Sequence, residues 1–431
     1  MGRRDGAQER VIDLTIQEFF NAVPRYPIYW AALIFYGTYP VFSSIMWVTT
    51  AFQFFARRER DDREKPEPLE HYPFVTVLIP AYCEAKVIRD SLEAATRIDY
   101  PEYEVVVVDD ASTDETKEVV REFVRRGDVR LIAKATNEGK AMALNDALPC
   151  IRGDLILIMD ADAEPDPQIL RWMVPHFRSS RVAGVTGNPR VSNRETFLSQ
   201  LQVVEFTSIV SMLRRAQRVW GRILTMSGVV GAFRKSALLD VGRYSPEMAT
   251  EDIELTWRLQ RAYYDVRYEP RGIVWMRVPS TLRGLVDQRR RWALGLAQVL
   301  RRHGGLARSW QNRRMWPVFW EAVVSILWAY TFILLTAFWL VSYAVGVPPI
   351  GVSPIPNWWG MTIATMCLLQ LLSGVVMDFR YDRSVARHFV VAVTYPMIYW
   401  MLMSAVTAIT TPRGLLRSAR RGSVTQWKTA R

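Results

Sequence analysis

The chain has 431 residues, half of them hydrophobic, and its 55 basic against 43 acidic side chains give a net charge of +12. This length and composition allow one sizeable α/β domain plus further segments. The basic surplus lies largely beside apolar segments, which favours anionic lipid headgroups or phosphorylated substrates over nucleic acid. The three cysteines are isolated and the four histidines are scattered, so the pattern excludes a zinc site and indicates a reducing compartment.

The first apolar stretch follows a polar N-terminal segment, residues 1–25, which lacks the apolar core and cleavage site of a signal peptide. Residues 26–56 carry no charge and are rich in aromatic side chains. Because about 20 apolar residues span a bilayer, this stretch predicts a transmembrane helix rather than a buried core helix. The linker that follows, residues 57–73, begins with an arginine-rich run, which favours the cytoplasmic side for this end of the helix.

Residues 74–281 show the alternation of strands and helices that is typical of a mostly parallel sheet flanked by helices. The predicted strands are residues 75–79, 104–108, 129–133, 155–159, 182–186 and 223–226. A helix is expected over residues 114–126, where Ser112 and Glu115 stand three residues apart, as in a capping box. The sequence therefore predicts one α/β domain, on the cytoplasmic side.

The C-terminal part alternates basic and apolar stretches. Residues 282–312 form a basic amphipathic region, as in a helix that lies in the membrane interface. Its apolar face comprises Leu285, Trp292, Leu296 and Val299. Residues 313–412 predict three apolar transmembrane segments, at 316–347, 358–377 and 389–411. A basic tail, residues 413–431, follows them.

The charges between these segments give conflicting signals about topology. The loop over residues 346–359 is uncharged, which favours the outside, whereas residues 378–388 are highly charged, which favours the inside. Three spans after a cytoplasmic domain would nevertheless leave the basic tail outside. Either the segment at 389–411, with Tyr395-Pro396 near its start, is not a simple span, or the positive-inside bias fails here.

Two carboxylates, Asp160 and Asp162, end the apolar run 155–159. In an open α/β sheet, ligands bind beyond the carboxyl ends of the strands. Acceptor-only oxygens of this kind hold a hard divalent cation, Mg²⁺ or Mn²⁺, which in turn holds phosphate oxygens. The alternative is a solvated strand end with a turn, so the pair gains its weight from the surrounding motifs.

Three further polar clusters stand at strand ends or helix starts of the same domain. They are residues 80–84 after the first strand, 109–112 after the second and 250–252 at the start of a helix. Each alone is a weak signal, but together with Asp160 and Asp162 they describe a nucleotide site. Carboxylates can accept hydrogen bonds from a base N–H and a ribose hydroxyl, and a metal neutralises a pyrophosphate leaving group. For Asp252, the alternative is an ordinary helix cap.

The basic helix carries Gln288, Arg291 and Trp292, and residues three and four apart share a helical face. Arg291 suits a diphosphate, because a guanidinium pairs bidentately with phosphate oxygens. Trp292 offers a flat apolar surface to a sugar ring. The alternative is an interfacial helix with snorkelling arginines and an anchoring tryptophan.

Several segments, in this order, resemble the processive family-two glycosyltransferases with a GT-A fold, the group that includes cellulose, chitin and hyaluronan synthases. The resemblance is closer to the bacterial synthases of poly-β-1,6-N-acetylglucosamine and covers most of residues 75–375. The matching segments are VDDASTDET, NEGKAMAL, MDADAEPD, GVTGNPRV, SGVVGAFRKSAL, TEDIELTWRLQ, YEPRGIVW and QRRRWALGLAQV. One departure concerns the N-terminus, because those synthases usually have two apolar segments before the domain and this chain shows one.

The resemblance implies a role for each candidate residue. The residues implied to bind the nucleotide are Tyr82, Glu84, Asp110, Lys140, Asp160 and Arg291. Asp160 and Asp162 are implied to bind the metal, and Asp252, with Glu251 beside it, to act as the general base. The residues implied to bind the acceptor are Thr250, Gln288 and Trp292. The mechanism is expected to be a single displacement with inversion, since one base and no obvious protein nucleophile are present.

The resemblance further implies UDP-N-acetylglucosamine as donor and a β-1,6-linked polymer that leaves through a channel in the bacterial inner membrane. It also implies a small membrane partner subunit and control by cyclic di-GMP, with no nucleic-acid partner. Three alternatives stay open: a synthase of another polymer, a non-processive transferase that loads a sugar onto polyprenyl phosphate, and a receptor or scaffold with an inactive domain. The motif from Gln288 to Trp292 argues against the second, and the complete set of carboxylates against the third.

Overall fold

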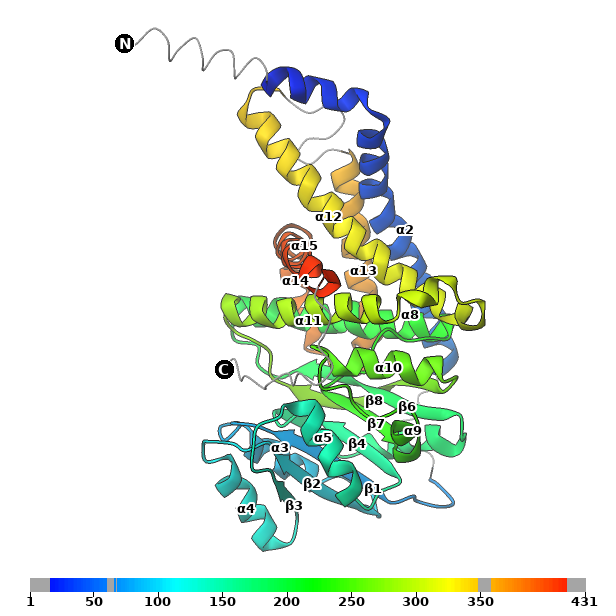
Figure 1. The fold of residues 1–431 in the computed structure, drawn as a ribbon, viewed down its shortest axis with the longest axis vertical. Coiled ribbons are helices and arrows are strands. Elements are labelled where there is room, and N and C mark those ends of the chain that lie inside the picture. Colours follow the sequence, from blue (N-terminus) through cyan, green and yellow to red (C-terminus); the bar gives the residue numbers. More distant parts are fainter. Residues whose placement is uncertain (1–15, 60–65, 67, 348–357, 417–431) are drawn as a thin grey trace, which may run out of the picture.

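The computed structural model describes the chain except residues 1–15, 60–65, 67, 348–357 and 417–431. The lower part of Figure 1 is an α/β domain, and long helices rise from its upper side. Most of the predicted N-terminal segment and of the basic tail lies outside the described residues, as do parts of the linker and of the uncharged loop.

A single sheet of eight strands forms the centre of the domain, in the order β3-β2-β1-β4-β7-β6-β8-β5. The strands are β1 Val75–Ala81, β2 Tyr103–Asp109, β3 Arg130–Ala133, β4 Leu155–Met159, β5 Ala163–Pro165, β6 Val182–Val191, β7 Val230–Arg234 and β8 Asp265–Met276. The first four strands run parallel to one another, as do β6 and β8. β7 is antiparallel to both β4 and β6, and β5 is antiparallel to β8. The prediction of a mostly parallel α/β fold is confirmed.

The central strands are continuous apolar runs because helices cover both faces of the sheet. In β1, Val77 and Ile79 point into one apolar cluster and Leu78 into the other, and all three are fully buried. The parallel register pairs Ala81 with Asp109 and Leu78 with Ile158. The carboxyl ends of β1, β2 and β4 therefore meet at one edge of the sheet.

Helices complete the domain. They are α3 Ile88–Ala95, α4 Thr116–Arg126, α5 Lys140–Ala147, α6 Ile169–Met173, α7 Phe197–Glu205, α8 Met212–Trp220, α9 Lys235–Asp240, α10 Glu251–Arg261 and α11 Leu282–Arg302. The last two lie on the side of the domain that faces the long helices (Figure 1). The basic amphipathic segment of the sequence is thus a helix, α11, placed between the sheet and the apolar part of the molecule.

The predicted capping box at α4 does not form. Ser112 Oγ instead accepts a hydrogen bond from the backbone N–H of Cys83, at 2.9 Å. The N-cap residue is Glu115, which makes no side-chain capping bond, and Asp114 before it binds the first helical residue instead: its Oδ1 accepts from the N–H of Thr116 at 3.1 Å and from its hydroxyl at 2.5 Å. The predicted contact of Ser112 with the start of α4 is therefore wrong, and Ser112 holds the loop that follows β1 instead.

The predicted strand at residues 223–226 is wrong, and the strand of this region is β7, further along the chain. Side chains rather than a neighbouring strand satisfy the backbone N–H groups here. Gln260 Oε1 accepts from Ile223, Gln217 Oε1 from Leu224 and Thr256 Oγ1 from Met226, each at 2.9 Å. An apolar run can thus be buried without joining the sheet when helices supply its acceptors.

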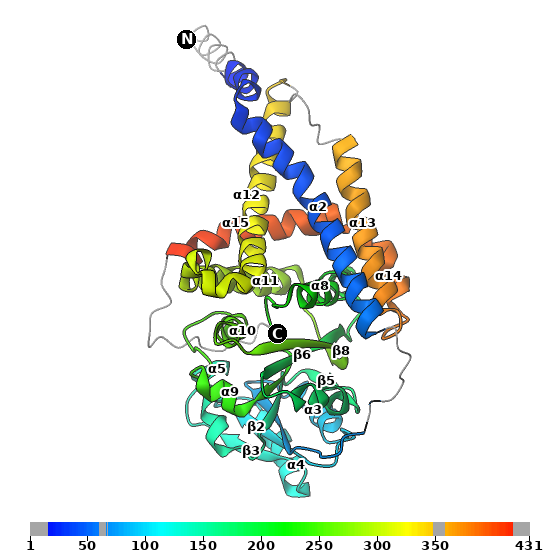
Figure 2. The same cartoon turned by 90° about the vertical axis from the view of Figure 1, so that its right-hand side faces the viewer.

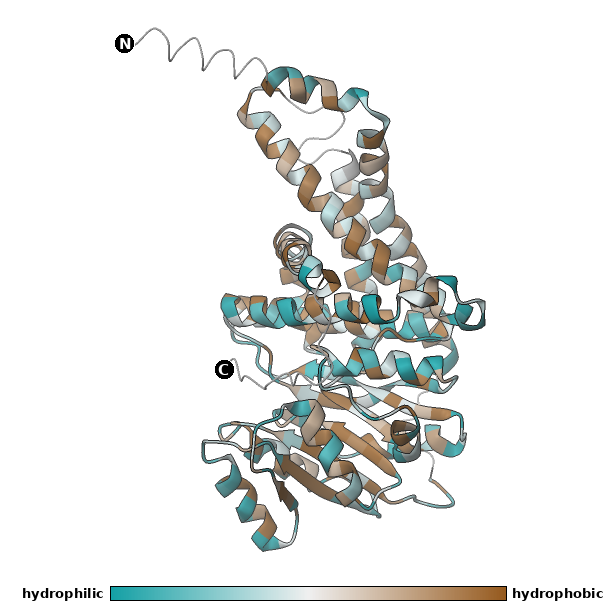
Figure 3. Ribbon diagram, in the orientation of Figure 1, coloured by the Kyte–Doolittle hydropathy of each residue, from teal (hydrophilic) through white to brown (hydrophobic). Residues whose placement is uncertain are grey.

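Among the described residues, three helices are long and apolar enough to cross a membrane: α2 Pro27–Arg58, α12 Trp316–Ala344 and α13 Trp358–Asp378. They rise together from the domain and are predominantly hydrophobic along their length (Figures 1 and 3). They correspond to the first predicted transmembrane helix and to the first two of the three predicted C-terminal segments.

The third predicted C-terminal span is not a single helix. Residues 389–411 are divided among α14 Val385–Ala392, a π-helical turn Tyr395–Tyr399 and α15 Trp400–Leu416. Pro396 lies in the turn, where it removes a backbone donor. Whereas α2, α12 and α13 run obliquely along the long axis, α15 lies across it (Figure 2).

Close packing against α11 holds α15 in this direction. A Cβ on Gly414 would lie 2.6 Å from the Cβ of Ala297 and 2.8 Å from the carbonyl oxygen of Leu294, so glycine is required there. Arg301 Nη1 also donates to the carbonyl of Leu415, at 2.7 Å. The structure therefore favours the first of the two readings of this segment, in which it is not a simple span.

A closed set of buried ion pairs, the junction cluster, joins the long helices to the domain. Arg215 of α8 binds both carboxylate oxygens of Glu59, at the end of α2, at 2.7 Å each. It also contacts Asp378, the last residue of α13, at 2.8 Å, and Arg190 of β6 binds the same carboxylate at 2.8 Å. All four side chains are at most 1% exposed.

Candidate functional site

The carboxyl ends of β1 and β2 turn through strained backbone. Cys83 and Ala111 have φ values of 54° and 61°, in the left-handed region that residues other than glycine seldom adopt. Their neighbours Tyr82 and Glu84 are half-buried at the rim of this sheet edge. Strain of this kind persists where surrounding contacts impose it, and it is concentrated at ligand sites.

Asp110 is fully buried and holds the loop that leads into α5. Its carboxylate accepts from the N–H of Glu138 at 3.1 Å and from that of Gly139 at 2.6 Å, and it lies 3.2 Å from Lys134 Nζ. Lys140 follows directly as the first residue of α5. Asp110 therefore fixes the start of α5, and with it the position of Lys140.

Lys140 connects the other polar clusters. Its Nζ lies 2.5 Å from Asp160 Oδ1 and 3.9 Å from Glu251 Oε1, and it donates to the carbonyl oxygen of Gly228 at 2.9 Å. Burial opposes the charged form of this lysine, but Asp160 and Glu251 outweigh that effect and raise its pKa. The structure thus brings the end of β4, the start of α5 and the start of α10 together around one ammonium group.

Asp252, in the first turn of α10, faces the same cluster. Its Oδ2 accepts from the N–H of Gly228 at 3.1 Å and its Oδ1 from the N–H of Ile253 at 2.9 Å. Burial and the neighbouring Glu251 raise the pKa of Asp252 to about 6, although Lys140 acts in the opposite direction. A carboxylate with such a pKa can accept a proton near neutral pH, as a general base must.

Gly228 is a site residue that the sequence analysis missed. Its carbonyl and N–H bind Lys140 and Asp252, and a Cβ there would lie 3.1 Å from Asp252 Oδ2 and 3.5 Å from Lys140 Nζ. The signal available in the sequence was a glycine just before an apolar strand, which often marks a close approach of the backbone to another group.

Thr250 docks α10 onto α11. A Cβ on Gly295 of α11 would lie 2.1 Å from Thr250 Oγ1, so the two helices touch through a residue without a side chain. The hydroxyl of Thr250 is buried and has no hydrogen-bond partner among the described residues. Because Asp252 lies two residues further along, this contact places it directly beneath the helix that carries Gln288, Arg291 and Trp292.

The three motif residues of α11 have different surroundings. Arg291 is exposed and close enough to Asp252 to lower its pKa, which partly offsets the effect of burial. Gln288 is half-buried, and its Oε1 has no partner within the described part of the chain. Trp292 is half-buried, and the guanidinium of Arg289 lies over its ring at 3.9 Å from the centroid. Arg289 was not predicted, because the motif leaves its position unspecified.

Asp160 and Asp162 lie at the end of β4 with 26% of the Asp160 side chain exposed and Asp162 nearly buried. No group of three or more carboxylate, imidazole or thiol ligands gathers as a metal site among the described residues. Two carboxylates are nevertheless a suitable donor set for Mg²⁺ or Mn²⁺, which commonly completes its shell with substrate phosphates and water. One oxygen of Asp160 is engaged by Lys140, so its other oxygen is the one available to a cation.

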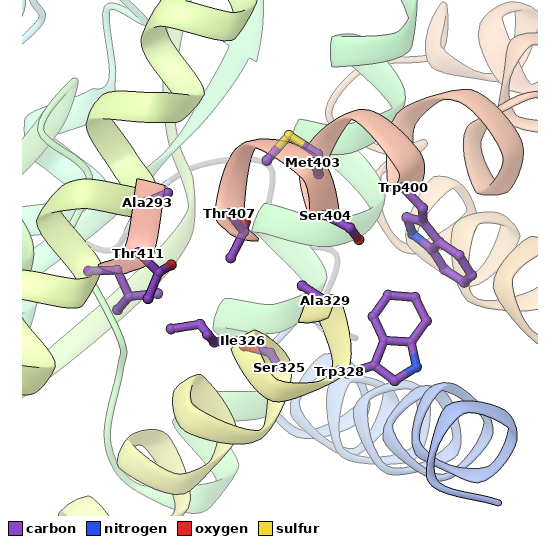
Figure 4. Close-up of a pocket in the computed structure, with 11 residues that line it drawn as sticks. Ala293, Ser325, Ile326, Trp328, Ala329, Trp400, Met403, Ser404, Thr407 and Thr411 are labelled. Carbon is purple, nitrogen blue, oxygen red and sulfur yellow. The ribbon is translucent and has the colours of Figure 1, made fainter. Parts of the chain in front are cut away.

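A cavity of about 220 Å³ lies between α11, α12 and α15. It is lined by Ala293, Leu296, Ser325, Ile326, Trp328, Ala329, Trp400, Met403, Ser404, Thr407 and Thr411. In Figure 4, Trp328 and Trp400 lie at one side and Ala293 and Thr411 at the other, and the two indole rings meet edge to face with centroids 5.5 Å apart. Ala293 is adjacent to Trp292, so the cavity begins beside the motif of α11.

The arrangement combines three chemical capacities within a few side chains. A half-buried carboxylate can accept a proton, a lysine and an exposed arginine can neutralise phosphate charge, and two strand-end carboxylates can hold a cation. Together they suit the transfer of a group from a phosphate-bearing donor to a hydroxyl.

Comparisons with known proteins agree with this chemistry. The family described as "Glycosyltransferase like family 2" matches residues 73–295. The poly-beta-1,6-N-acetyl-D-glucosamine synthase of Staphylococcus epidermidis is 31% identical over 395 residues, with 90% of this chain and 95% of the relative covered. The synthase of the same name from Staphylococcus aureus strain COL is 30% identical over 395 residues, with the same coverage.

A solved structure shares the fold. The mannosyltransferase PcManGT from Pyrobaculum calidifontis, in complex with GDP-Man and Mn²⁺, aligns over 89% of this chain and 98% of its own, with a TM-score of 0.62 and 23% identity. The match to the family over residues 73–295 and the identity to the two synthases decide the assignment: the chain belongs to glycosyltransferase family 2.

Proposed function

We propose that this glycosyltransferase is an inverting, processive enzyme that builds poly-β-1,6-N-acetylglucosamine from UDP-N-acetylglucosamine. The relatives at 30–31% identity over 90% of the chain carry the name of that product. The observation that carries the mechanism is Asp252, a half-buried carboxylate with a pKa of about 6 beneath the helix of Trp292.

In the proposed step, Asp252 accepts the proton of the acceptor 6-hydroxyl as that oxygen attacks the anomeric carbon of the donor. The new C–O bond forms as the bond to the UDP oxygen breaks, and UDP leaves from the opposite face, which inverts the configuration. Burial and the neighbouring Glu251 keep the pKa of Asp252 high, and the N–H of Gly228 orients the carboxylate. No covalent intermediate is needed.

Donor binding is assigned to the strand ends. Tyr82, Glu84 and Asp110 surround the proposed uridine position, with Asp110 acting through the loop that it holds. Lys140 and Arg291 approach the proposed diphosphate from α5 and α11. Asp160 and Asp162 would hold Mg²⁺ or Mn²⁺, as Mn²⁺ accompanies GDP-Man in PcManGT, and this ion would neutralise charge on the leaving diphosphate.

Acceptor binding is assigned to α11 and the cavity beyond it. Trp292 provides the stacking surface, Gln288 has an unengaged amide oxygen for a hydroxyl, and Thr250 lies next to the base. The cavity of Figure 4 then continues the path with two tryptophans and four hydroxyl side chains, the combination of apolar faces and hydrogen-bonding groups that sugars require. We therefore assign the growing polymer to this cavity.

The proposed topology follows from three spans. With the domain in the cytoplasm of a bacterial cell, the chain crosses the membrane inward through α2, outward through α12 and inward again through α13. Helices α14 and α15 then stay on the cytoplasmic side. The basic tail then also lies inside, in agreement with the positive-inside bias. The small partner subunit and the control by cyclic di-GMP remain predictions from the resemblance.

The decisive experiment incubates membranes that contain the protein with labelled UDP-N-acetylglucosamine and digests the product with linkage-specific hydrolases. A long polymer sensitive only to a β-1,6-specific enzyme supports the proposal. A polymer with another linkage would assign the chain to another synthase of the family. A single sugar extractable with polyprenyl phosphate would overturn processivity.

A further inference from the structure

Arg289 lies inside the motif of α11 but does not face the donor site. It is fully buried, its guanidinium stacks on Trp292 at 3.9 Å from the ring centroid, and its Nη2 binds Glu205 Oε2 at 2.5 Å. The same oxygen of Glu205 accepts the hydroxyl of Tyr399, also at 2.5 Å. Three elements far apart in the sequence, α7, α11 and the turn before α15, thus converge behind one indole ring.

The way Arg289 uses its donors shows what sets its orientation. In the junction cluster, Arg215 binds Glu59 with both prongs of its guanidinium, the arrangement that an arginine and a carboxylate prefer. Arg289 binds Glu205 through one prong, and its Nε and Nη1 have no hydrogen-bond partner among the described residues. An arginine that served only to neutralise Glu205 would bind the carboxylate with two nitrogens. The stacking contact with Trp292 therefore determines the position of the Arg289 guanidinium.

The two residues that hold Arg289 stand at the edges of irregular helix. Glu205 immediately precedes the π-helical segment Phe206–Ser211, and Tyr399 ends the π-helical turn Tyr395–Tyr399. Insertions of this kind shift the side chains of a helix out of their regular register, and they are frequently found at functional sites. One helix thus departs from regular geometry directly after the residue that carries this carboxylate, and the other up to the residue that donates to it.

We propose that Arg289 is a positioning residue for the acceptor: with Glu205 and Tyr399 behind it, it fixes the plane of the Trp292 ring. This inference rests on the proposed acceptor role of Trp292. The guanidinium covers one face of the indole, which leaves only the opposite face for a sugar and so defines on which side of α11 the acceptor lies. Because Tyr399 belongs to the segment that leads into α15, the ring and one wall of the cavity are set by the same contacts.

The test separates ring position from overall folding. Arg289→Lys keeps the positive charge for Glu205 but loses the planar face, and Tyr399→Phe removes only the hydroxyl contact. The matched control is Asp382→Asn, which breaks the ion pair of Asp382 with Arg194, at 2.6 Å and 6% exposure of the carboxylate, a pair that includes none of Arg289, Glu205 and Tyr399. For equal amounts of folded protein, UDP affinity, UDP release without transfer and product length are measured.

We expect UDP affinity within twofold of wild type for all three variants. Arg289→Lys should lower elongation on the order of tenfold, with shorter chains and a larger share of donor hydrolysed to free sugar, and Tyr399→Phe should show a smaller change in the same direction. Asp382→Asn should lower thermal stability without changing product length. Equal losses of UDP affinity and elongation in Arg289→Lys, or normal product length in both variants, would overturn the proposal.

Ring position is read directly with 5-fluorotryptophan and ¹⁹F NMR. The chain has 16 tryptophans, so the Trp292 signal is assigned by its loss in Trp292→Phe. Arg289→Lys and Glu205→Gln should shift or broaden that signal, and Asp382→Asn should not. A Trp292 signal unchanged in both variants would sink the positioning role. If the signal shifts but Trp292→Ala still makes full-length polymer, Arg289 does position the ring, and the acceptor role of Trp292 fails instead.

Discussion

Two buried clusters of charge differ in how completely they are paired. The junction cluster contains two arginines and two carboxylates, Arg190, Arg215, Glu59 and Asp378, and each carboxylate is bound by at least one guanidinium. The site cluster surrounds a single ammonium, that of Lys140, with three carboxylates, those of Asp160, Glu251 and Asp252. Both are largely shielded from water, but only the first is balanced within itself.

The difference distinguishes charged groups that stabilise the fold from charged groups that are available to a ligand or a reaction. A cluster whose charges are balanced gains nothing from a ligand, so it serves to hold α2, α8 and α13 together where they meet the sheet. An excess of half-buried carboxylates raises the free energy of the unliganded site and shifts pKa values, and a cation or a proton can relieve this excess of negative charge. Two further cations interact with Asp252: Arg291, which is exposed, and Arg214, which is buried and donates to the carbonyl oxygen of Gly187 at 3.0 Å.

The largest expected effect comes from removing divalent cations. The site cluster has an excess of negative charge, which must be offset before a diphosphate can approach, so excess EDTA should abolish transfer and Mg²⁺ or Mn²⁺ should restore it. The junction cluster needs no cation, so the protein should remain folded in EDTA. Full transfer activity in EDTA would contradict the assignment of Asp160 and Asp162.

Asp252→Asn tests the site cluster itself. The substitution keeps the shape of the side chain but removes its ability to accept a proton, so polymerisation should fall by a factor on the order of 10²–10⁴. UDP affinity, measured by calorimetry, should be nearly unchanged, because this carboxylate is proposed to face the acceptor. If affinity and activity fall together, Asp252 is a nucleotide ligand or a structural cap.

Asp378→Asn tests the junction cluster. Removing one partner of a buried ion pair leaves Arg190 and Arg215 with excess positive charge, which typically costs about 3–5 kcal/mol. We expect a lower unfolding temperature and a smaller yield, while the folded fraction retains its activity within about twofold. A loss of activity per folded molecule would show that the junction also controls the site, and would break the distinction drawn between the clusters.

The same contrast explains how much the sequence revealed. The strand ends that carry Asp110 and Asp160 were predictable, because continuous apolar runs mark buried parallel strands and their polar ends share one edge. β8 was not predicted, since Pro270 and Gly272 interrupt its apolar residues, and such residues ordinarily mark a turn. The helices of the membrane part were found from length and composition, except where Pro396 and packing on α11 divide one apolar run.

Contacts between distant residues escaped sequence reasoning. Glu205 and Arg289 are 84 positions apart, and Glu59 and Arg215 are 156 apart, so neither pair has a local signature. Gly228 left only the weak signal of a glycine before a strand. The candidate site was thus visible as separate clusters, but its centre, Lys140 between Asp160 and the backbone of Gly228, follows from the fold.

The smallest effect, and the most specific to the site cluster, is the pH dependence of elongation. Burial and Glu251 raise the pKa of Asp252 to about 6, and the base is active only as the carboxylate. The rate at saturating donor should therefore be level above about pH 7 and should fall toward tenfold per pH unit well below pH 6. The contribution of Asp252 to stability changes with pH in the opposite direction. Because its pKa in the folded state lies above the ordinary value, protonation of Asp252 favours the folded state, so this contribution increases as the pH falls. Glu251→Gln removes the neighbouring negative charge, so it should move the midpoint of the profile to lower pH, whereas Asp382→Asn should leave the midpoint in place. A midpoint that stays near pH 6 in Glu251→Gln would show that a different group limits the rate.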